Sequence, residues 1–276
     1  MNAPQIQWYP GHIAKYEREL KQKLGPVDVV VVVLDARLPK ASYNHRLVKT
    51  ISGKPVLVLL NKSDLGDNAQ NKLWVKKFEN AMLYEAMTPK QRDVLISKII
   101  TLAEPKIQRL MAKGLKRRAV RVLIAGMPNV GKSSLINNIV GRKKAKTGHK
   151  AGVTRTGQWV TIHPQVELLD TPGIIPPILT NNETGALLAC VSSVGEAAYE
   201  DEAVAGFLLA CIEDLYPGLV AKYFNMSPDT ELSLAGIAEA RQYKVSGGEP
   251  DARRAGQALL SEFRQGKLGR ITLEHV

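Results

Sequence analysis

The stretch Gly126-Met127-Pro128-Asn129-Val130-Gly131-Lys132-Ser133 decides the fold, because it has the spacing of a loop that binds nucleotide phosphates. The apolar run 120–125 precedes it and residues 133–140 read as a helix, so the loop joins a strand to a helix. Glycines let the backbone N–H groups of such a loop point at the phosphates, and the helix N-terminus adds partial positive charge. We expect Lys132 to reach the phosphate oxygens and the Ser133 hydroxyl to ligate Mg²⁺. The motif predicts a nucleotide and leaves the base open.

The pattern around this loop predicts an α/β sheet followed by helices. Short runs rich in Val and Ile, typical of buried parallel strands, alternate with amphipathic stretches that are typical of helices. The expected strands are 28–35, 55–60, 81–85, 119–125, 158–163 and 166–170, and the expected surface helices are 71–80 and 91–110. Beyond residue 181, Ala- and Leu-rich stretches predict helices at 185–194, 202–215, 219–224, 232–240 and 251–264. We therefore expect a six-stranded, mostly parallel sheet within residues 1–178 and an all-α domain over residues 179–276.

Composition and charge narrow the class of protein. With 45% hydrophobic and 23% charged residues, the 276-residue chain reads as an ordinary globular protein. Its two cysteines are too few for a disulfide framework, and no apolar run is long enough to span a membrane, so a cytoplasmic protein without a membrane partner is expected. The net charge of +12 is lopsided: residues 1–180 carry 30 Lys and Arg against 12 Asp and Glu, whereas residues 181–276 carry 8 against 14. Nucleic acid is the expected polyanion.

The tetrapeptide Asn61-Lys62-Ser63-Asp64 follows the second expected strand and bears on the choice of base. The ionised carboxylate of Asp64 offers only acceptors, which suit the N1–H and N2–H donors of guanine, whereas adenine presents an acceptor at N1. Asn61 and the stem of Lys62 are expected to hold the ring's other edge and its face. Alone, this tetrapeptide would be read as a polar turn, but beside a phosphate-binding loop it predicts GTP and GDP as ligands.

A third motif, Asp170-Thr171-Pro172-Gly173, closes the last expected strand. Asp170 is expected to hold Mg²⁺ through water, and the Gly173 N–H to meet the γ-phosphate, which makes this segment a sensor of the nucleotide state. A loop with two threonines precedes it, and we expect Thr154 to complete the Mg²⁺ shell, with Thr156 as the alternative.

The order of these motifs is rotated relative to ordinary GTPases, in which the Asn-Lys-x-Asp element comes last. With Trp8-Tyr9-Pro10-Gly11-His12-Ile13-Ala14-Lys15 and Asp35-Ala36-Arg37-Leu38-Pro39, the chain resembles the ribosome biogenesis GTPase A family over most of residues 8–177. The resemblance implies a circularly permuted P-loop GTPase that hydrolyses GTP and assists assembly of the large ribosomal subunit, with that subunit and its rRNA as partners, and we expect a monomer. A guanine-loop element is assigned to Ala86, between Glu85 and Met87. The expected nucleotide site comprises Asn61, Lys62, Asp64, Ala86, Asn129, Val130, Gly131, Lys132, Ser133, Ser134, Thr154 and Gly173, with Ser133, Thr154 and Asp170 around Mg²⁺.

The segment after Gly173 lacks a residue that many GTPases use. Ile174 and Ile175 stand where a glutamine commonly orients the attacking water, so slow intrinsic turnover is expected. His12 is a candidate for orienting that water, against the reading of an ordinary surface histidine. The resemblance further implies that Asn129 can hold K⁺ near the β/γ bridge. The expected catalytic set is His12, Lys132 and Gly173.

Two basic clusters flank the nucleotide motifs, one within residues 142–155 and one within residues 113–121. Such clusters neutralise phosphates without reading sequence, so they predict salt-sensitive binding to folded rRNA; solvated loops are the alternative reading. The short tether after Gly173 leads to the hypothesis that the γ-phosphate reorients the helical domain. Two other function classes stay open. One is a GTP-gated switch that binds a protein without rRNA contact, and the other is a structural RNA-binding protein in which bound GTP only fixes the shape of the protein.

Overall fold

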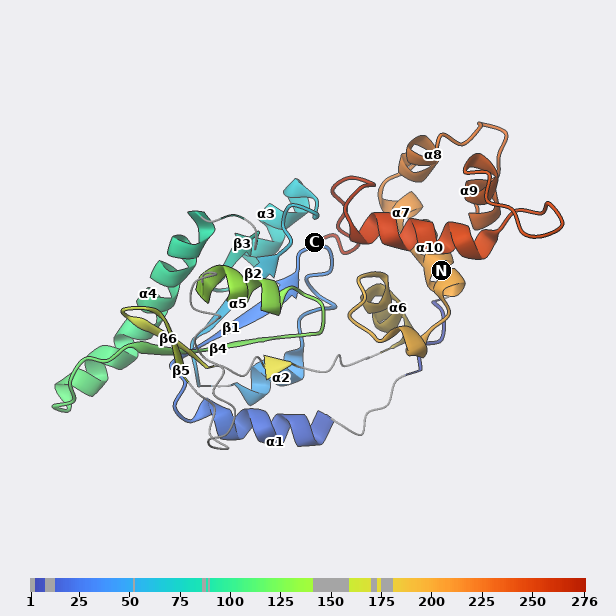
Figure 1. Ribbon diagram of the computed structural model, residues 1–276. Helices are drawn as coiled ribbons and strands as arrows, with labels where there is room; N and C mark the ends of the chain where they lie inside the picture. Colours follow the sequence, from blue (N-terminus) through green and yellow to red (C-terminus); the bar gives the residue numbers. More distant parts are fainter. Residues whose placement is uncertain are drawn as a thin grey trace.

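The computed structural model describes residues 3–7, 13–51, 53–85, 88, 90–140, 159–169, 173–174 and 181–276. Its sheet has the strand order β3-β2-β1-β4-β6-β5 (Figure 1). Neighbouring strands are parallel except for the antiparallel pair β5 and β6. The strands are β1 (Val29–Asp35), β2 (Val56–Asn61), β3 (Ala81–Tyr84), β4 (Val120–Gly126), β5 (Trp159–His163) and β6 (Val166–Leu169). The predicted six-stranded, mostly parallel sheet is confirmed, and a two-residue strand, β7 (Gly173–Ile174), additionally pairs with β4.

Strand β1 shows why these segments read as unbroken apolar runs. All seven of its residues are buried. Val29, Val31 and Val33 belong to the hydrophobic core on one side of the sheet, and Val30, Val32 and Leu34 to the core on the other. Because this strand is covered on both faces, its first six residues are all apolar and the alternation of polar and apolar residues is lost; its one charged residue, Asp35, stands at the strand's end.

Helices cover both faces of the sheet. Helices α4 (Lys90–Ala112) and α5 (Lys132–Val140) contribute Leu95 and Leu135 to the first core. Helices α1 (Ile13–Leu24) and α3 (Asn68–Lys77) contribute Leu20 and Trp74 to the second. The short α2 (His45–Thr50) lies beside α1 at the lower edge of Figure 1.

The remaining part is all-α, as predicted, and lies beside the sheet (Figure 1). Its helices are α6 (Asn182–Cys190), α7 (Asp201–Leu215), α8 (Leu219–Phe224), α9 (Leu234–Ala240) and α10 (Ala252–Arg264), with a 3₁₀ turn, η2 (Glu196–Ala198). Its core continues without a break into the first core of the sheet. Helix α6 begins three residues before the predicted start, because the Asn181 side chain accepts a hydrogen bond from the Thr184 N–H and caps the helix. Among the described helices, none combines the length and apolarity that a bilayer crossing requires.

Candidate nucleotide-binding site

The phosphate-binding loop joins β4 to α5, as its sequence predicts. Two of its glycines are required by close packing. A Cβ on Gly126 would lie 2.6 Å from the Val33 carbonyl oxygen, and one on Gly131 would lie 2.2 Å from Nδ2 of Asn61. Gly131 also has a φ of +96°, a conformation that other residues resist. The loop is therefore built against β1 and against the first residue of the guanine motif.

Side chains of the guanine motif hold the phosphate-binding loop directly. The Asn61 Nδ2 donates to the Val130 carbonyl at 2.8 Å, and the Lys62 Nζ donates to the Asn129 carbonyl at 2.6 Å. These contacts join residues more than sixty positions apart. The structure thus brings two motifs together that the rotated order separates in sequence. Asp64 is exposed and makes no hydrogen bond or ion pair with the described part of the chain.

The buried carboxylate of Asp35 binds both Lys62 of the guanine motif and Arg37. Lys62 Nζ lies 2.9 Å from its Oδ2, and the Arg37 guanidinium binds both of its oxygens, at 2.9 and 2.8 Å. Burial disfavours the charged form, but the attraction of Arg37 and Lys62 outweighs it and holds the pKa of Asp35 far below its usual value. An ionised Asp35 therefore fixes the direction in which the Lys62 stem runs.

The loop lysine, Lys132, is buried at the start of α5 and donates to the Met127 carbonyl of its own loop. Burial lowers the pKa of Lys132 to about 8. Phosphates placed beside it would favour the charged form. Ser133 and Ser134, in the same first turn of α5, are exposed.

The third motif reaches the loop through β7. Gly173 pairs with Ala125 and Ile174 pairs with Gly126, so the backbone of Gly173 lies where β4 enters the phosphate-binding loop. Sequence patterns did not indicate this strand, because two residues are too short for any periodicity. The other predicted site residues, His12, Ala86, Thr154 with its alternative Thr156, and Asp170, lie outside the described residues.

The donors in the described part of the site suit Mg²⁺ shared with phosphates rather than a metal held by the protein alone. No group of three or more His, Cys, Asp or Glu that could hold a metal occurs among the described residues. The Ser133 hydroxyl is a hard oxygen ligand in the first turn after the loop, and Mg²⁺ at nucleotide sites takes few protein ligands together with phosphate oxygens. The amide oxygen of Asn129 is likewise an oxygen ligand that a monovalent cation could use.

Three residues without a predicted role also contact the site. Arg37, in the quoted Asp35–Pro39 segment, donates to the carbonyls of Phe263 and Arg264 at the end of α10. Ser192 and Ser193, beyond the end of α6, bond to the phosphate-binding loop. No local sequence pattern marks such contacts between a side chain and a distant backbone.

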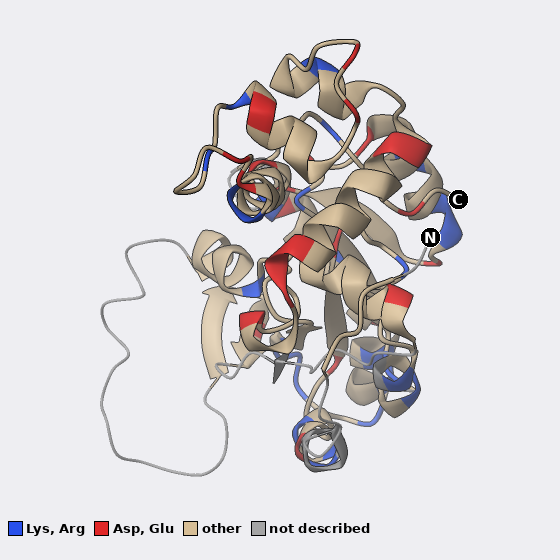
Figure 2. Cartoon of the chain, turned by 90° about the vertical axis from the view of Figure 1, so that its right-hand side faces the viewer, with Lys and Arg blue, Asp and Glu red and all other residues tan. Residues whose placement is uncertain are grey.

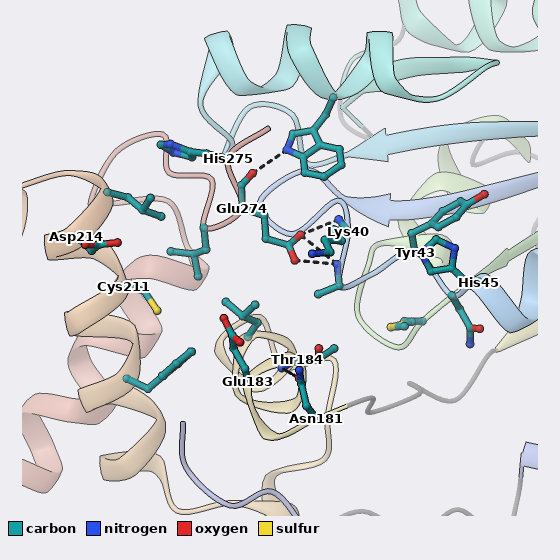
Figure 3. Close-up of a pocket in the computed structure, with 18 of the residues that line it drawn as sticks. Lys40, Tyr43, His45, Asn181, Glu183, Thr184, Cys211, Asp214, Glu274 and His275 are labelled. Atoms are coloured by element: carbon teal, nitrogen blue, oxygen red, sulfur yellow. Dashed lines mark hydrogen bonds between the residues drawn. The ribbon is translucent and has the colours of Figure 1, made fainter. Parts of the chain in front are cut away.

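The described residues up to 174 form the sheet part and residues 181–276 form the helical part. A cavity of about 760 Å³ lies between these two parts (Figure 3). Glu274, near the end of the chain, lines it and accepts hydrogen bonds from the backbone N–H groups of Lys40 and Ala41. Burial raises the pKa of Glu274 to about 7, although these two N–H groups oppose the shift. Residues 268–276, which include Glu274, form a tail beside the guanine motif. In this tail the Ile271 N–H donates to the carbonyl of Leu65, the residue after the motif, at 3.0 Å.

Comparison with known proteins gives consistent matches over the whole chain. A family model described as "50S ribosome-binding GTPase" matches residues 121–209. "Ribosome biogenesis GTPase A" of Bacillus cereus is 36% identical, with 98% of this chain and 93% of that protein covered. The protein of the same name from Thermotoga maritima is 32% identical, with coverage of 98% and 94%. The crystal structure of GNP-bound YlqF from T. maritima matches with a TM-score of 0.66 and 28% identity, covering 95% of this chain and 98% of that one. With its rotated motifs joined in one site and relatives of this identity along its length, the chain belongs to the ribosome biogenesis GTPase A family.

Proposed function

We propose that this GTPase acts in ribosome biogenesis, where it binds the maturing large ribosomal subunit and couples its GTP state to late assembly. The observation that carries the proposal is the direct contact of Asn61 and Lys62 with the phosphate-binding loop. A base selected by the first motif and phosphates bound by the second would belong to one nucleotide. The relatives' names and the basic charge of residues 1–180 support the ribosomal setting.

In this proposal each motif has a separate task. Asp64 is free to accept the two guanine donors, and Lys132 grips the β- and γ-phosphates. Ser133, Thr154 and Asp170 would hold Mg²⁺, which neutralises the charge that develops on the phosphate oxygens. The Gly173 N–H would contact the γ-phosphate and so distinguish GTP from GDP.

The intrinsic rate of hydrolysis is proposed to be low and to rise on the ribosomal particle. Ile174 has no hydrogen-bonding group with which to orient water. We assign that task to His12 and the stabilisation of the β/γ bridge to K⁺ on Asn129. Exchange of Na⁺ for K⁺ should then raise the rate. Full particle-stimulated turnover in a His12→Ala variant that binds GTP normally would remove His12 from the mechanism.

The ribosomal contact is assigned to the basic part of the chain. The charges of α1 and α2 are mostly basic, and these helices form the lower edge of the molecule in Figure 2. The basic cluster at 113–121 is a second candidate for this contact, and the predicted cluster at 142–155 lies outside the described residues. Residues 181–231, by contrast, carry one Lys and nine Asp and Glu, a composition that repels rRNA.

Co-sedimentation with purified large subunits tests the proposal. We expect more protein in the pellet with a non-hydrolysable GTP analogue than with GDP, a steep decrease between 50 and 200 mM salt, and faster GTP turnover in the same samples. Equal pelleting in both nucleotide states would refute the coupling. Absence of binding at low salt would refute the ribosomal partner.

The acidic composition of residues 181–231 favours one alternative, a GTP-gated switch that binds a basic protein without touching rRNA. A binding measurement with protein-free 23S rRNA distinguishes this alternative from the ribosomal proposal. The alternative predicts no salt-sensitive binding to that RNA, whereas the ribosomal proposal predicts it.

A further inference from the structure

The phosphate-binding loop is also held by the helical part of the chain. The Asn129 Nδ2 donates to the Ser192 carbonyl at 2.6 Å, and the Ser193 Oγ donates to the Pro128 carbonyl at 2.9 Å. Ser193 is 1% exposed, so water cannot readily replace its bond. Two successive loop residues therefore have their partners on two successive residues beyond α6.

The turn that carries these partners has one defined shape. The Ser192 N–H donates to the Ala189 carbonyl at 3.0 Å, and the Ser193 N–H donates to the Leu188 carbonyl at 2.8 Å. This is the Schellman pattern of a helix end, in which the first residue beyond the cap is left-handed and is usually glycine. Ser192 takes that place with a φ of 58°. The direction of its carbonyl is thus set by how α6 ends.

The end of α6 is in turn fixed by α10 and by Arg37. The Arg264 side chain donates to the carbonyls of Cys190 and Ala189, at 3.0 and 2.9 Å, while its own carbonyl accepts from Arg37. Arg37 binds Asp35, Asp35 binds Lys62, and Lys62 binds the Asn129 carbonyl, as described above. These bonds close a ring that includes the guanine motif, the phosphate-binding loop and two helices of the helical part.

The contact with Ser192 determines which way the Asn129 amide points. A carbonyl only accepts, so the nitrogen of the amide must face Ser192 and the oxygen must face away from it. No hydrogen bond to this oxygen is made by the described residues. The helical part therefore leaves Asn129 with its acceptor available, which is the end that a cation requires.

We propose that the turn at Ser192 and Ser193 is a positioning element of the nucleotide site, which holds the phosphate-binding loop in its receptive shape and sets the direction of the Asn129 amide. The inference rests on the proposed nucleotide site. It gives the helical part a route to the phosphates that does not pass through the segment after Gly173. By linkage, whatever displaces α6 changes nucleotide affinity, and nucleotide binding changes the stability of the α6 contact by the same factor.

Fluorescent GDP binding tests the turn with two matched pairs of variants in the full chain. Ser193→Ala removes the hydroxyl, and we expect about fivefold weaker GDP binding, the effect of one neutral hydrogen bond. Ser193→Thr retains the hydroxyl and should bind within about twofold of the wild type. Ser192→Val disfavours the left-handed turn and should weaken binding at least about fivefold, whereas Ser192→Gly suits it and should not. Circular dichroism establishes that each variant is folded.

A third variant separates positioning of the loop from general loosening of the interface. The Tyr216 hydroxyl holds Thr272 in the tail, away from the phosphate-binding loop. Tyr216→Phe should therefore leave GDP affinity unchanged. If it weakened GDP binding as much as Ser193→Ala does, or if both Ser193→Ala and Ser192→Val bound like the wild type, the turn would have no positioning role.

Turnover in K⁺ and in Na⁺ is the second readout. The ratio of the two rates should move towards one in Ser192→Val and stay at the wild-type value in Ser192→Gly. A wild type that shows no K⁺ preference would contradict the proposed cation at Asn129, and GDP affinity would still decide on the turn. A wild type that does not bind GDP would contradict the nucleotide site itself.

Discussion

Replacement of Arg37 by methionine should destabilise the protein far more than loss of a surface arginine. Arg37 is 2% exposed, and its side chain makes two hydrogen bonds to Asp35 and two to backbone carbonyls of α10. Methionine fills similar space but donates nothing. The variant leaves the buried carboxylate of Asp35 with Lys62 as its remaining cationic partner among the described residues.

The size of the effect follows from burial. Removal of one member of a buried ion pair costs about 3–5 kcal/mol, because the other charge stays in a medium that solvates it poorly. We therefore expect Arg37→Met to lower the free energy of unfolding by about 3–5 kcal/mol in urea titrations followed by circular dichroism. Arg117→Met serves as the control, because the ion pair of Arg117 with Glu104 is exposed, and its urea midpoint should match the wild type.

A double variant tests the reasoning. Asp35→Leu combined with Arg37→Met removes both buried charges, and Lys62, whose side chain is 25% exposed, can turn to water. The double variant should be more stable than the sum of the two single losses predicts, by about 2 kcal/mol or more. Additive losses, or a cost below about 1 kcal/mol for Arg37→Met alone, would refute the view that Asp35 is an ionised group held by Arg37.

Four further results are expected. Because the pKa of Lys132 is about 8 and phosphates favour its charged form, GDP affinity should be constant below pH 8 and fall above it; a flat titration profile up to pH 10 would contradict this. The pKa of Glu274 is raised from 4.5 to about 7, so the stabilisation of the folded state that this shift provides is complete below pH 4.5 and lost as pH rises through 7. In urea titrations across that range, the free energy of unfolding of the wild type should therefore fall relative to that of Glu274→Gln. A constant difference between the two proteins would contradict the raised pKa. Asp64→Asn should weaken GDP binding about ten- to a hundredfold and favour xanthosine nucleotides, since the amide donates where the carboxylate accepts; competition binding would show unchanged base preference if the assignment is wrong. Gly131→Ala should abolish GDP binding, whereas Gly114→Ala, at a similar φ of +82° but with open space around it, should not; equal effects would show that the collision with Asn61 is unimportant.

Local patterns were sufficient for most of the fold. Buried parallel strands such as Val29–Asp35 are continuous apolar runs, and the loop Gly126–Ser133 predicts the strand before it and the helix after it. Helix ends were less predictable. Asn181 caps α6 earlier than its apolar stretch indicates, because a capping side chain acts outside the periodic pattern.

The site was predictable where a motif defines its own chemistry. The contact between the guanine motif and the phosphate-binding loop agrees with the rotated motif order, whereas the roles of the individual residues remain predictions. No local sequence pattern indicates the hydrogen bonds between the phosphate-binding loop and Ser192 and Ser193, since each joins a side chain to a carbonyl more than sixty residues away. A serine at a left-handed helix end, where glycine is usual, gives no local sign that it serves a distant loop.

The tail contact has a consequence for synthesis on the ribosome. The Leu65 carbonyl, one residue beyond the guanine motif, receives its partner from Ile271, which is made roughly two hundred residues later. The Arg37 carbonyl likewise accepts its hydrogen bond from the Leu273 N–H, which is also synthesised much later. A nascent chain that already contains every nucleotide motif therefore still lacks the hydrogen bonds that Ile271 and Leu273 donate to the segments containing Leu65 and Arg37, so these segments reach their final arrangement only after the tail has been made.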